Sequence, residues 1–259
     1  MLKYILLDER SFRNDGGLTH VKDRCIEFLK VSILLHLIPV MPKLPLCNLH
    51  SKKQNCFLHE YIQIPDFVLL DLPPETQTKE VFTWTLKDSF IPNDELFLKY
   101  KDAAEKMMLN LKFLDKYESI ARNICSQLNR PLCVLHVRRG DYLQILPRLK
   151  NTTSPEHIKN ILQKHSFADC YIHTNENQDN FFDSLKDIFS IKLFSDFQTL
   201  KEINETGDNY ALYAIECCIR DLADIRISTF NTTESDKAYL PNNDSAYFSD
   251  YLDETKGWQ

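Results

Sequence analysis

Apolar and polar positions alternate in a way that predicts an α/β unit at the start of the chain. Residues 3–8 form a short apolar run typical of a strand, and a polar stretch ending in Asp15-Gly16-Gly17 follows it. Residues 37–40 predict the next short strand. Between these runs, apolar positions recur at helical spacing, at Val21, Cys25, Leu29 and Ile33. The expected order is therefore strand, glycine loop, helix, strand.

The middle of the chain is less regular. Residues 42–74 are rich in proline and predict no particular element. Helical spacing returns from residue 94, with one apolar stripe over 96–111 and another over 113–128. These stripes end at Asn129-Arg130-Pro131, a helix-breaking sequence that predicts a domain boundary.

Strand and helix patterns alternate regularly beyond that boundary. This alternation predicts an α/β domain with a parallel sheet and helices on both of its faces. The expected domains are 1–129 and 130–245, with a tail at 246–259 that packs back on the first. Ligands of such sheets bind beyond the carboxyl ends of the strands. The predicted strands are 132–137, 170–173, 191–194 and 224–228, and the predicted helices are 154–165, 181–188 and 209–220.

Composition excludes several classes of protein. A chain of 259 residues that is 43% hydrophobic is too long and too apolar to be disordered. Its formal charge of −6 gives no support to a nucleic-acid partner. The longest strongly apolar run, 31–41, is much shorter than the roughly 20 residues that cross a bilayer, so no membrane span is expected.

Cysteines and glycosylation sequons point to different compartments. The eight cysteines form no Cys-x-x-Cys pair, which argues against zinc and predicts mostly reduced core residues. The chain opens without an apolar signal segment, so a cytosolic protein is expected, or a lumenal one if an anchor precedes the sequence. Four Asn-x-Ser/Thr sequons would be glycosylated only in a secretory lumen, at Asn151, Asn204, Asn231 and Asn243.

The richest chemistry lies at the end of the strand that opens the second half, in His136-Val137-Arg138-Arg139-Gly140-Asp141. Strand alternation puts His136 and Arg138 on one face, where imidazole and guanidinium can meet one ligand. Arginine's planar fork suits a phosphate, and Asp141 could orient it. The alternative is a surface ion pair. The early Gly16-Gly17 loop could likewise bring backbone N–H groups to a phosphate, or could simply form a tight turn.

The motif His-x-Arg-Arg-x-Asp resembles the signature of the fucosyltransferases that share one ancestry, namely the α-1,2 and α-1,6 enzymes and the protein O-fucosyltransferases. The resemblance extends to the glycine loop, to His173-Thr174-Asn175-Glu176 and to residues 223–233. It implies a GT-B fold, in which two Rossmann-like domains face each other across a cleft. It also implies GDP-fucose as donor, inversion at the anomeric carbon, and neither metal ion nor cofactor.

The same resemblance implies roles for single residues. Arg138 would be catalytic and grip the β-phosphate, His136 would contact the nucleoside, and Glu216 would read guanine, although Asp is frequent at that position. Asp15 is the expected catalytic base, with Asp141 as the alternative. The other residues expected at the donor come from the glycine loop, the Arg-Arg motif and a late loop: Gly16, Gly17, Leu18, Thr19, Arg139, Asp141, Ser228, Thr229, Phe230, Asn231 and Thr232.

The predicted function is therefore that of an inverting, metal-independent fucosyltransferase that transfers L-fucose from GDP-fucose to a glycan hydroxyl. Two alternatives stay open. One is a protein O-fucosyltransferase acting on Ser or Thr. The other is an inactive sugar-nucleotide or glycan-binding module with the same fold.

Overall fold

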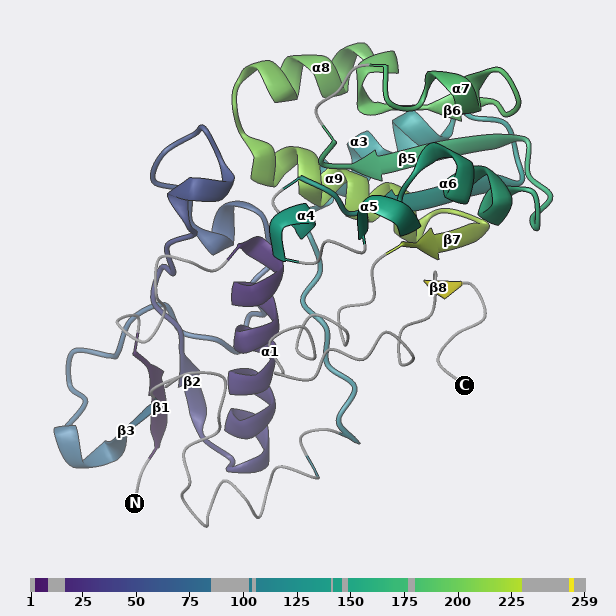
Figure 1. Cartoon of the computed structure of the whole chain (residues 1–259). Coiled ribbons are helices and arrows are strands. Elements are labelled where there is room, and N and C mark those ends of the chain that lie inside the picture. The colour runs from purple at the N-terminus through teal and green to yellow at the C-terminus, as the bar shows by residue number, and fades with distance from the viewer. Residues whose placement is uncertain are drawn as a thin grey trace. The chain divides into compact units, whose positions relative to one another are not determined.

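The computed structural model describes residues 3–8, 17–84, 103, 106–140, 142–145, 149–176, 180–229 and 252–253 (Figure 1). The chain divides into two compact units. The first comprises Met1–Tyr117 with Ile203–Ala214, and the second comprises Glu118–Glu202 with Ile215–Gln259. Each unit is a mixed α/β structure with a sheet of parallel strands. The predicted domain ranges 1–129, 130–245 and 246–259 stay predictions.

The sheet of the first unit has the order β2-β1-β3. Strand β1 (Tyr4–Leu7) lies in the centre and pairs in parallel with β2 (Ile38–Val40) and β3 (Val81–Trp84). Helix α1 (Leu18–Leu34) connects β1 to β2 and runs beside them (Figure 1). The predicted order of strand, helix and strand is confirmed, whereas β3 was not predicted. Three 3-10 helices complete the described part: η2 (Asn48–His50), η3 (Leu58–Glu60) and η4 (Thr78–Glu80).

The segment Ile203–Ala214 belongs to the first unit because its backbone is bonded there. The Gly207 carbonyl accepts hydrogen bonds from the backbone N–H groups of Lys52 and Lys53, both at 3.0 Å, and from Ser51 Oγ at 2.9 Å. Gly207 has a φ of +75°, and a Cβ there would lie 2.7 Å from the Lys52 Cβ. Only glycine fits both this conformation and this close approach.

The sheet of the second unit has the order β6-β5-β4-β7-β8. The first four strands are parallel, as predicted, and β8 (Leu252–Asp253) runs antiparallel to β7. Their register places His136 opposite both His173 and Ser228. The parallel strands are β4 (Leu132–Val137), β5 (Asp169–Thr174), β6 (Ile191–Lys192) and β7 (Ile225–Ser228).

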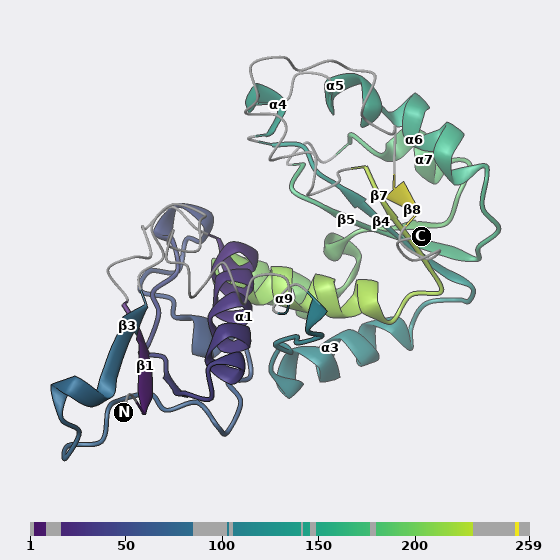
Figure 2. The same ribbon diagram turned by 90° about the horizontal axis from the view of Figure 1, so that it is seen from below.

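Helices cover both faces of this sheet, as expected from the alternation (Figure 2). Cys133, Leu135 and Val137 of β4 pack in a core with α6 (Pro155–Leu162) and α7 (Asp183–Lys186). On the other face, Tyr171 bonds to Glu216 of α9 (Asn209–Asp221). The remaining helical segments are α3 (Asp115–Cys125), α4 (Tyr142–Ile145), α5 (Leu149–Thr152), η5 (Phe194–Asp196) and α8 (Gln198–Glu205).

Local signals explain where α6 begins. Ser154 is its N-cap, and the Ser154 Oγ accepts a hydrogen bond from the His157 N–H at 3.3 Å, with Pro155 in the first turn. The prediction for 181–188 is less accurate, since only Asp183–Lys186 is α-helical there. A helix of four residues is about one turn long, so the spacing of its apolar positions does not show where it begins and ends.

All eight cysteines are buried and none is in a disulfide, as expected of reduced core residues. Among the described helices, none combines the length and the apolar character that a membrane span requires.

Candidate functional site

The carboxyl ends of β4, β5 and β7 form one edge of the second sheet. The Thr229 N–H, just after β7, donates to the His136 carbonyl at 2.9 Å, and Val137 is in register with Thr174. Parallel pairing therefore brings the residues that follow three separate strands to the same place. Of the predicted site residues, His136, Arg138, Arg139, Ser228 and Thr229 meet there.

The backbone N–H of Arg138 is hydrogen-bonded to the side chain of Thr229. Thr229 Oγ1 lies 3.4 Å from the Arg138 N–H, which donates to it, and 3.2 Å from the His136 carbonyl, which accepts from it. Arg138 is half-buried, and alternation along β4 puts it on the His136 face. The site thus combines a half-buried arginine with a threonine hydroxyl that the backbone of Arg138 and His136 holds in place.

Arg139 lies on the opposite face. Its Nε donates to Glu176 Oε2 at 2.6 Å, its Nη1 donates to Thr153 Oγ1 at 2.6 Å, and its guanidinium lies 4.1 Å from the centre of the Phe181 ring. Only 8% of Arg139 is exposed. These bonds make Arg139 an anchor for the loop that carries Arg138, and a direct contact of Arg139 with a donor stays a prediction.

Gly140 fits this anchored loop tightly. Its φ is +51°, and a Cβ there would lie 2.5 Å from Asn175 Nδ2. The amide of Asn175 has little freedom to withdraw, because Asn175 Oδ1 accepts the Arg139 N–H at 2.8 Å. Asn175, Glu176 and Thr153 were not among the predicted site residues. The signal for the first two was the motif His173-Thr174-Asn175-Glu176 at the end of a predicted strand.

Two histidine rings lie side by side across β4 and β5. The ring centres of His136 and His173 are 4.8 Å apart, and His136 Nδ1 lies 3.2 Å from Ser228 Oγ. Burial, with help from the charges of Arg220 and Arg138, lowers the pKa of His136 to about 3. His136 is therefore neutral near pH 7, and it offers a ligand one ring nitrogen as donor or acceptor rather than a positive charge.

Glu216 lies beneath His173 and is 4% exposed. Glu216 Oε2 is 3.3 Å from His173 Nε2, and Glu216 Oε1 accepts the Tyr171 hydroxyl at 2.9 Å. Burial raises the pKa of Glu216 to about 8, although the Tyr171 bond acts in the opposite direction. Burial also holds the pKa of His173 well below its usual range. Each carboxyl oxygen already has a partner inside the core, and little of Glu216 is exposed to a ligand. Guanine reading by Glu216 stays a prediction.

The predicted residues of the glycine loop belong to the first unit. Gly17 is the N-cap of α1 with a φ of −73°, and a Cβ there would lie 3.5 Å from the His50 ring, an ordinary contact. Gly17 is therefore not required by its backbone conformation. Leu18 is buried in the core, and Thr19 Oγ1 is hydrogen-bonded to the Tyr213 hydroxyl at 2.7 Å.

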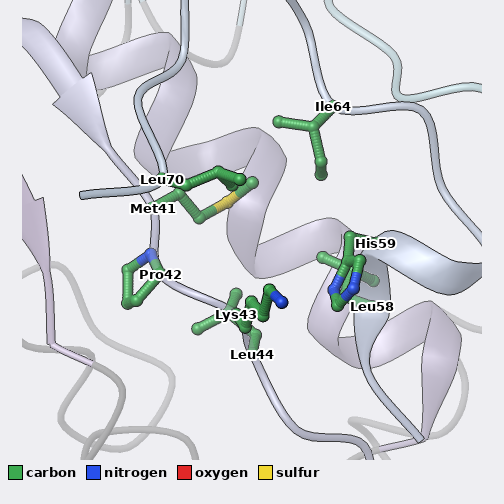
Figure 3. A pocket seen from close by; sticks show the side chains of 8 residues that line it. All are labelled: Met41, Pro42, Lys43, Leu44, Leu58, His59, Ile64 and Leu70. Atoms are coloured by element: carbon green, nitrogen blue, oxygen red, sulfur yellow. The ribbon is translucent and has the colours of Figure 1, made fainter.

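A small pocket lies just after β2 in the first unit (Figure 3). Its lining is mainly apolar, with Lys43 and His59 as its basic side chains, and a diphosphate would find little there to bind. The lining residues are Met41, Pro42, Lys43, Leu44, Leu58, His59, Ile64 and Leu70.

Six predicted site residues lie outside the described ranges: Asp15, Gly16, Asp141, Phe230, Asn231 and Thr232. Within those ranges, no three His, Cys, Asp or Glu side chains converge to hold a metal ion.

Comparisons by sequence find no protein-family model and no curated protein that matches this chain. Comparison by structure finds crystal structures of POFUT1, a protein O-fucosyltransferase. Its complex with GDP-fucose gives a TM-score of 0.52 at 12% identity and covers 91% of this chain and 93% of that chain. Its complex with GDP gives 0.50 at 10% identity and covers 91% and 94%. The likeness shows a shared α/β fold with parallel sheets.

Proposed function

We propose that this chain is an inverting, metal-independent fucosyltransferase of the GT-B type, with GDP-fucose as donor and a cleft between two facing domains. The observation that carries the proposal is the likeness of fold, over most of both chains, to POFUT1 in its complex with GDP-fucose. A basic strand-end site in a parallel sheet supports it independently, because ligands of such sheets bind beyond the carboxyl ends of the strands.

Arg138 is the residue proposed to bind the β-phosphate. Departure of GDP from the sugar concentrates negative charge on that phosphate, and the planar guanidinium can donate two hydrogen bonds to it. Ser228 and Thr229 would add hydroxyl groups. Donors that are oriented before the reaction stabilise the developing charge, and one such contact contributes roughly 2.7–4 kcal/mol in the transition state.

Inversion needs one displacement. The acceptor hydroxyl attacks the anomeric carbon on the face opposite GDP, the bond from that carbon to the phosphate oxygen breaks, and the hydroxyl proton passes to a base. We propose Asp15 as that base and Asp141 as the alternative. Gly16, Phe230, Asn231 and Thr232 complete the proposed donor site.

The proposal has two candidate acceptors and one alternative without a reaction. A glycan hydroxyl is the first candidate, as the sequence predicts. A Ser or Thr hydroxyl on a protein is the second, and the likeness to a protein O-fucosyltransferase favours it. An inactive module that binds the sugar nucleotide is the alternative without chemistry.

The test is donor binding and donor hydrolysis with a matched pair of arginine variants. Arg138→Ala should abolish the slow release of fucose from GDP-fucose and should weaken GDP binding by calorimetry. Arg130→Ala is the control, since Arg130 precedes the opposite end of β4 and pairs with Asp224 at 2.7 Å. That variant should keep both activities.

Each outcome separates the candidates. Wild-type protein that binds GDP but leaves GDP-fucose intact, with glycan and protein acceptors both present, would support the inactive module. Equal loss in the two arginine variants would remove Arg138 from the site. Loss of activity with EDTA would contradict the metal-independent mechanism. Wild-type protein that binds neither GDP nor GDP-fucose would overturn the proposal.

A further inference from the structure

Three buried polar side chains are in contact in a row, from Tyr171 through Glu216 to His173. The distances are 2.9 Å from the Tyr171 hydroxyl to Glu216 Oε1 and 3.3 Å from Glu216 Oε2 to His173 Nε2. Side-chain exposure is 6% for both Glu216 and His173, and Tyr171 is fully buried. No solvent molecule can replace these partners without a rearrangement of the core.

Glu216 and His173 can share their protons in two ways. When Glu216 is protonated, its Oε2–H donates to His173 Nε2, and the single proton of the neutral imidazole is on Nδ1. When Glu216 is ionised, the single imidazole proton is on Nε2, which donates a hydrogen bond to the carboxylate, and Nδ1 carries no proton. One proton is released between the two states, and the edge of the ring away from Glu216 changes from donor to acceptor.

The surroundings of the pair keep the imidazole neutral in both arrangements, since burial and nearby positive charge oppose a further proton on His173. Positive charge comes from Arg138 after β4 and from Arg220 on α9. The other titratable groups that act on Tyr171 and His173 are His136 on β4, Asp196 in η5 and Cys125 at the end of α3.

We propose that Glu216 is a positioning residue whose proton selects the tautomer of His173, and with it whether Nδ1, on the ring edge away from Glu216, is a donor or an acceptor beside His136 at the strand ends. His173 transmits the state because its ring packs 4.8 Å from that of His136, which is held to Ser228 on its other side. The consequence for the donor rests on the proposed function. An ionised Glu216 adds a buried negative charge behind a site that binds an anion, so donor affinity falls when Glu216 loses its proton.

This role differs from guanine reading in a way that a single substitution separates. Glu216→Gln keeps an oxygen for the Tyr171 hydroxyl and an N–H for His173 Nε2, so it reproduces the protonated arrangement and cannot titrate. A guanine reader must accept hydrogen bonds from the base, and an amide accepts through only one of its two atoms. If Glu216 only positions His173, Glu216→Gln should retain the preference for GDP over UDP. If Glu216 binds the guanine base, the variant should lose that preference.

The primary experiment is nitrogen NMR of the histidine side chains in the ligand-free protein, from about pH 6 to about pH 10. A His173→Gln variant assigns the His173 signals. In wild type, His173 should change from the Nδ1–H to the Nε2–H tautomer with a midpoint near 8, the pKa of Glu216. Glu216→Gln should hold the Nδ1–H tautomer throughout. Tyr171→Phe should move the midpoint to higher pH, because the Tyr171 bond lowers the pKa of Glu216.

The second experiment measures GDP affinity from about pH 7 to about pH 9.5. Wild-type affinity should fall by roughly three- to tenfold across the Glu216 transition, the size expected for one altered hydrogen bond. Glu216→Gln should show no such fall. Glu205→Gln, the same change at an exposed position of α8, should behave as wild type.

The outcomes distinguish this proposal from the function on which it rests. A single His173 tautomer in wild type, or the same switch in Glu216→Gln as in wild type, would overturn it. If Glu216→Gln does not fold, an unmoved midpoint in Tyr171→Phe overturns it instead. Loss of the GDP preference in Glu216→Gln would replace positioning with guanine reading. The expected tautomer switch in a protein that binds no GDP would support positioning and overturn the fucosyltransferase.

Discussion

Arg139 and Glu176 form an ion pair inside the second unit, with 2.6 Å between Nε and Oε2 and side-chain exposures of 9% and 11%. The pair joins the loop after β4 to the end of β5. The two neighbouring arginines of the motif therefore differ in their burial and in their contacts. Arg139 holds the loop, whereas Arg138 is half-buried and its backbone N–H donates to Thr229 at the carboxyl edge of the strands.

Arg139→Met should lower the free energy of unfolding by about 3–5 kcal/mol, because it leaves the Glu176 carboxylate buried without its partner. Urea unfolding measures the change. The control is Glu118→Gln, which breaks the pair of Glu118 with Arg122 on α3, where the side chains are 40% and 63% exposed. That pair should contribute less than about 1 kcal/mol. Equal costs for the two variants would contradict the anchoring role of Arg139.

Gly140→Ala should destabilise the protein by about 2 kcal/mol or more, since an L-residue is strained at a φ of +51° and its Cβ would lie 2.5 Å from Asn175 Nδ2. Gly17→Ala is the matched control. Its Cβ makes only an ordinary contact, and the poorer helix cap is offset by lower entropy of the unfolded chain, so the net change should be under about 1 kcal/mol. Thermal unfolding of both variants tests this, and a reversed order would refute it.

Stability should be greatest near pH 6.5. Above that pH, folded protein keeps the Glu216 proton up to about 8, whereas the unfolded chain loses it near 4.5, so folding weakens as the pH rises. The loss is about 1.4 kcal/mol for each pH unit between those limits. Below pH 6.5, the unfolded chain binds two protons, at His136 and His173, that the folded protein does not. These outweigh the one proton that Glu216 binds only in the folded protein, so stability falls as the pH falls.

Urea midpoints measured across this pH range test the assignment. Glu216→Gln should remove the decline between pH 6.5 and pH 8, and Glu205→Gln should leave it in place. A wild-type protein whose stability does not change between those values would show that Glu216 is already ionised at pH 6.5.

Asp208 should be the strongest single anchor of the segment Ile203–Ala214 in the first unit. Asp208 Oδ1 accepts the Tyr61 hydroxyl at 2.9 Å and the Ala211 N–H at 3.0 Å, and Oδ2 lies 3.0 Å from Lys53 Nζ. Asp208→Ala should cost about 2–3 kcal/mol, because it removes a helix cap and the partner of a buried hydroxyl. Asp208→Asn keeps the Oδ1 acceptor and should cost less. Hydrogen exchange at Ala211 should accelerate in the first variant and change little in the second.

Local patterns in the sequence were sufficient for the elements that local physics controls. The apolar run 132–137 is β4 as predicted, and the cap and proline at Ser154 and Pro155 mark the start of α6. Each of these signals is carried by neighbours along the chain, so periodicity and caps are enough to read it.

The tertiary structure alone decided which distant side chains meet. Nothing near Glu216 in the sequence indicates that Tyr171 and His173 occupy its two oxygens, or that Gly207 receives the backbone of Lys52 and Lys53. The contact of Arg139 with Thr153, Glu176 and Phe181 has the same origin. These partners lie on different strands and helices, and they meet because sheet register and helix packing bring them together. Burial then shifts the pKa of Glu216 and of His136, which residue type and spacing do not reveal.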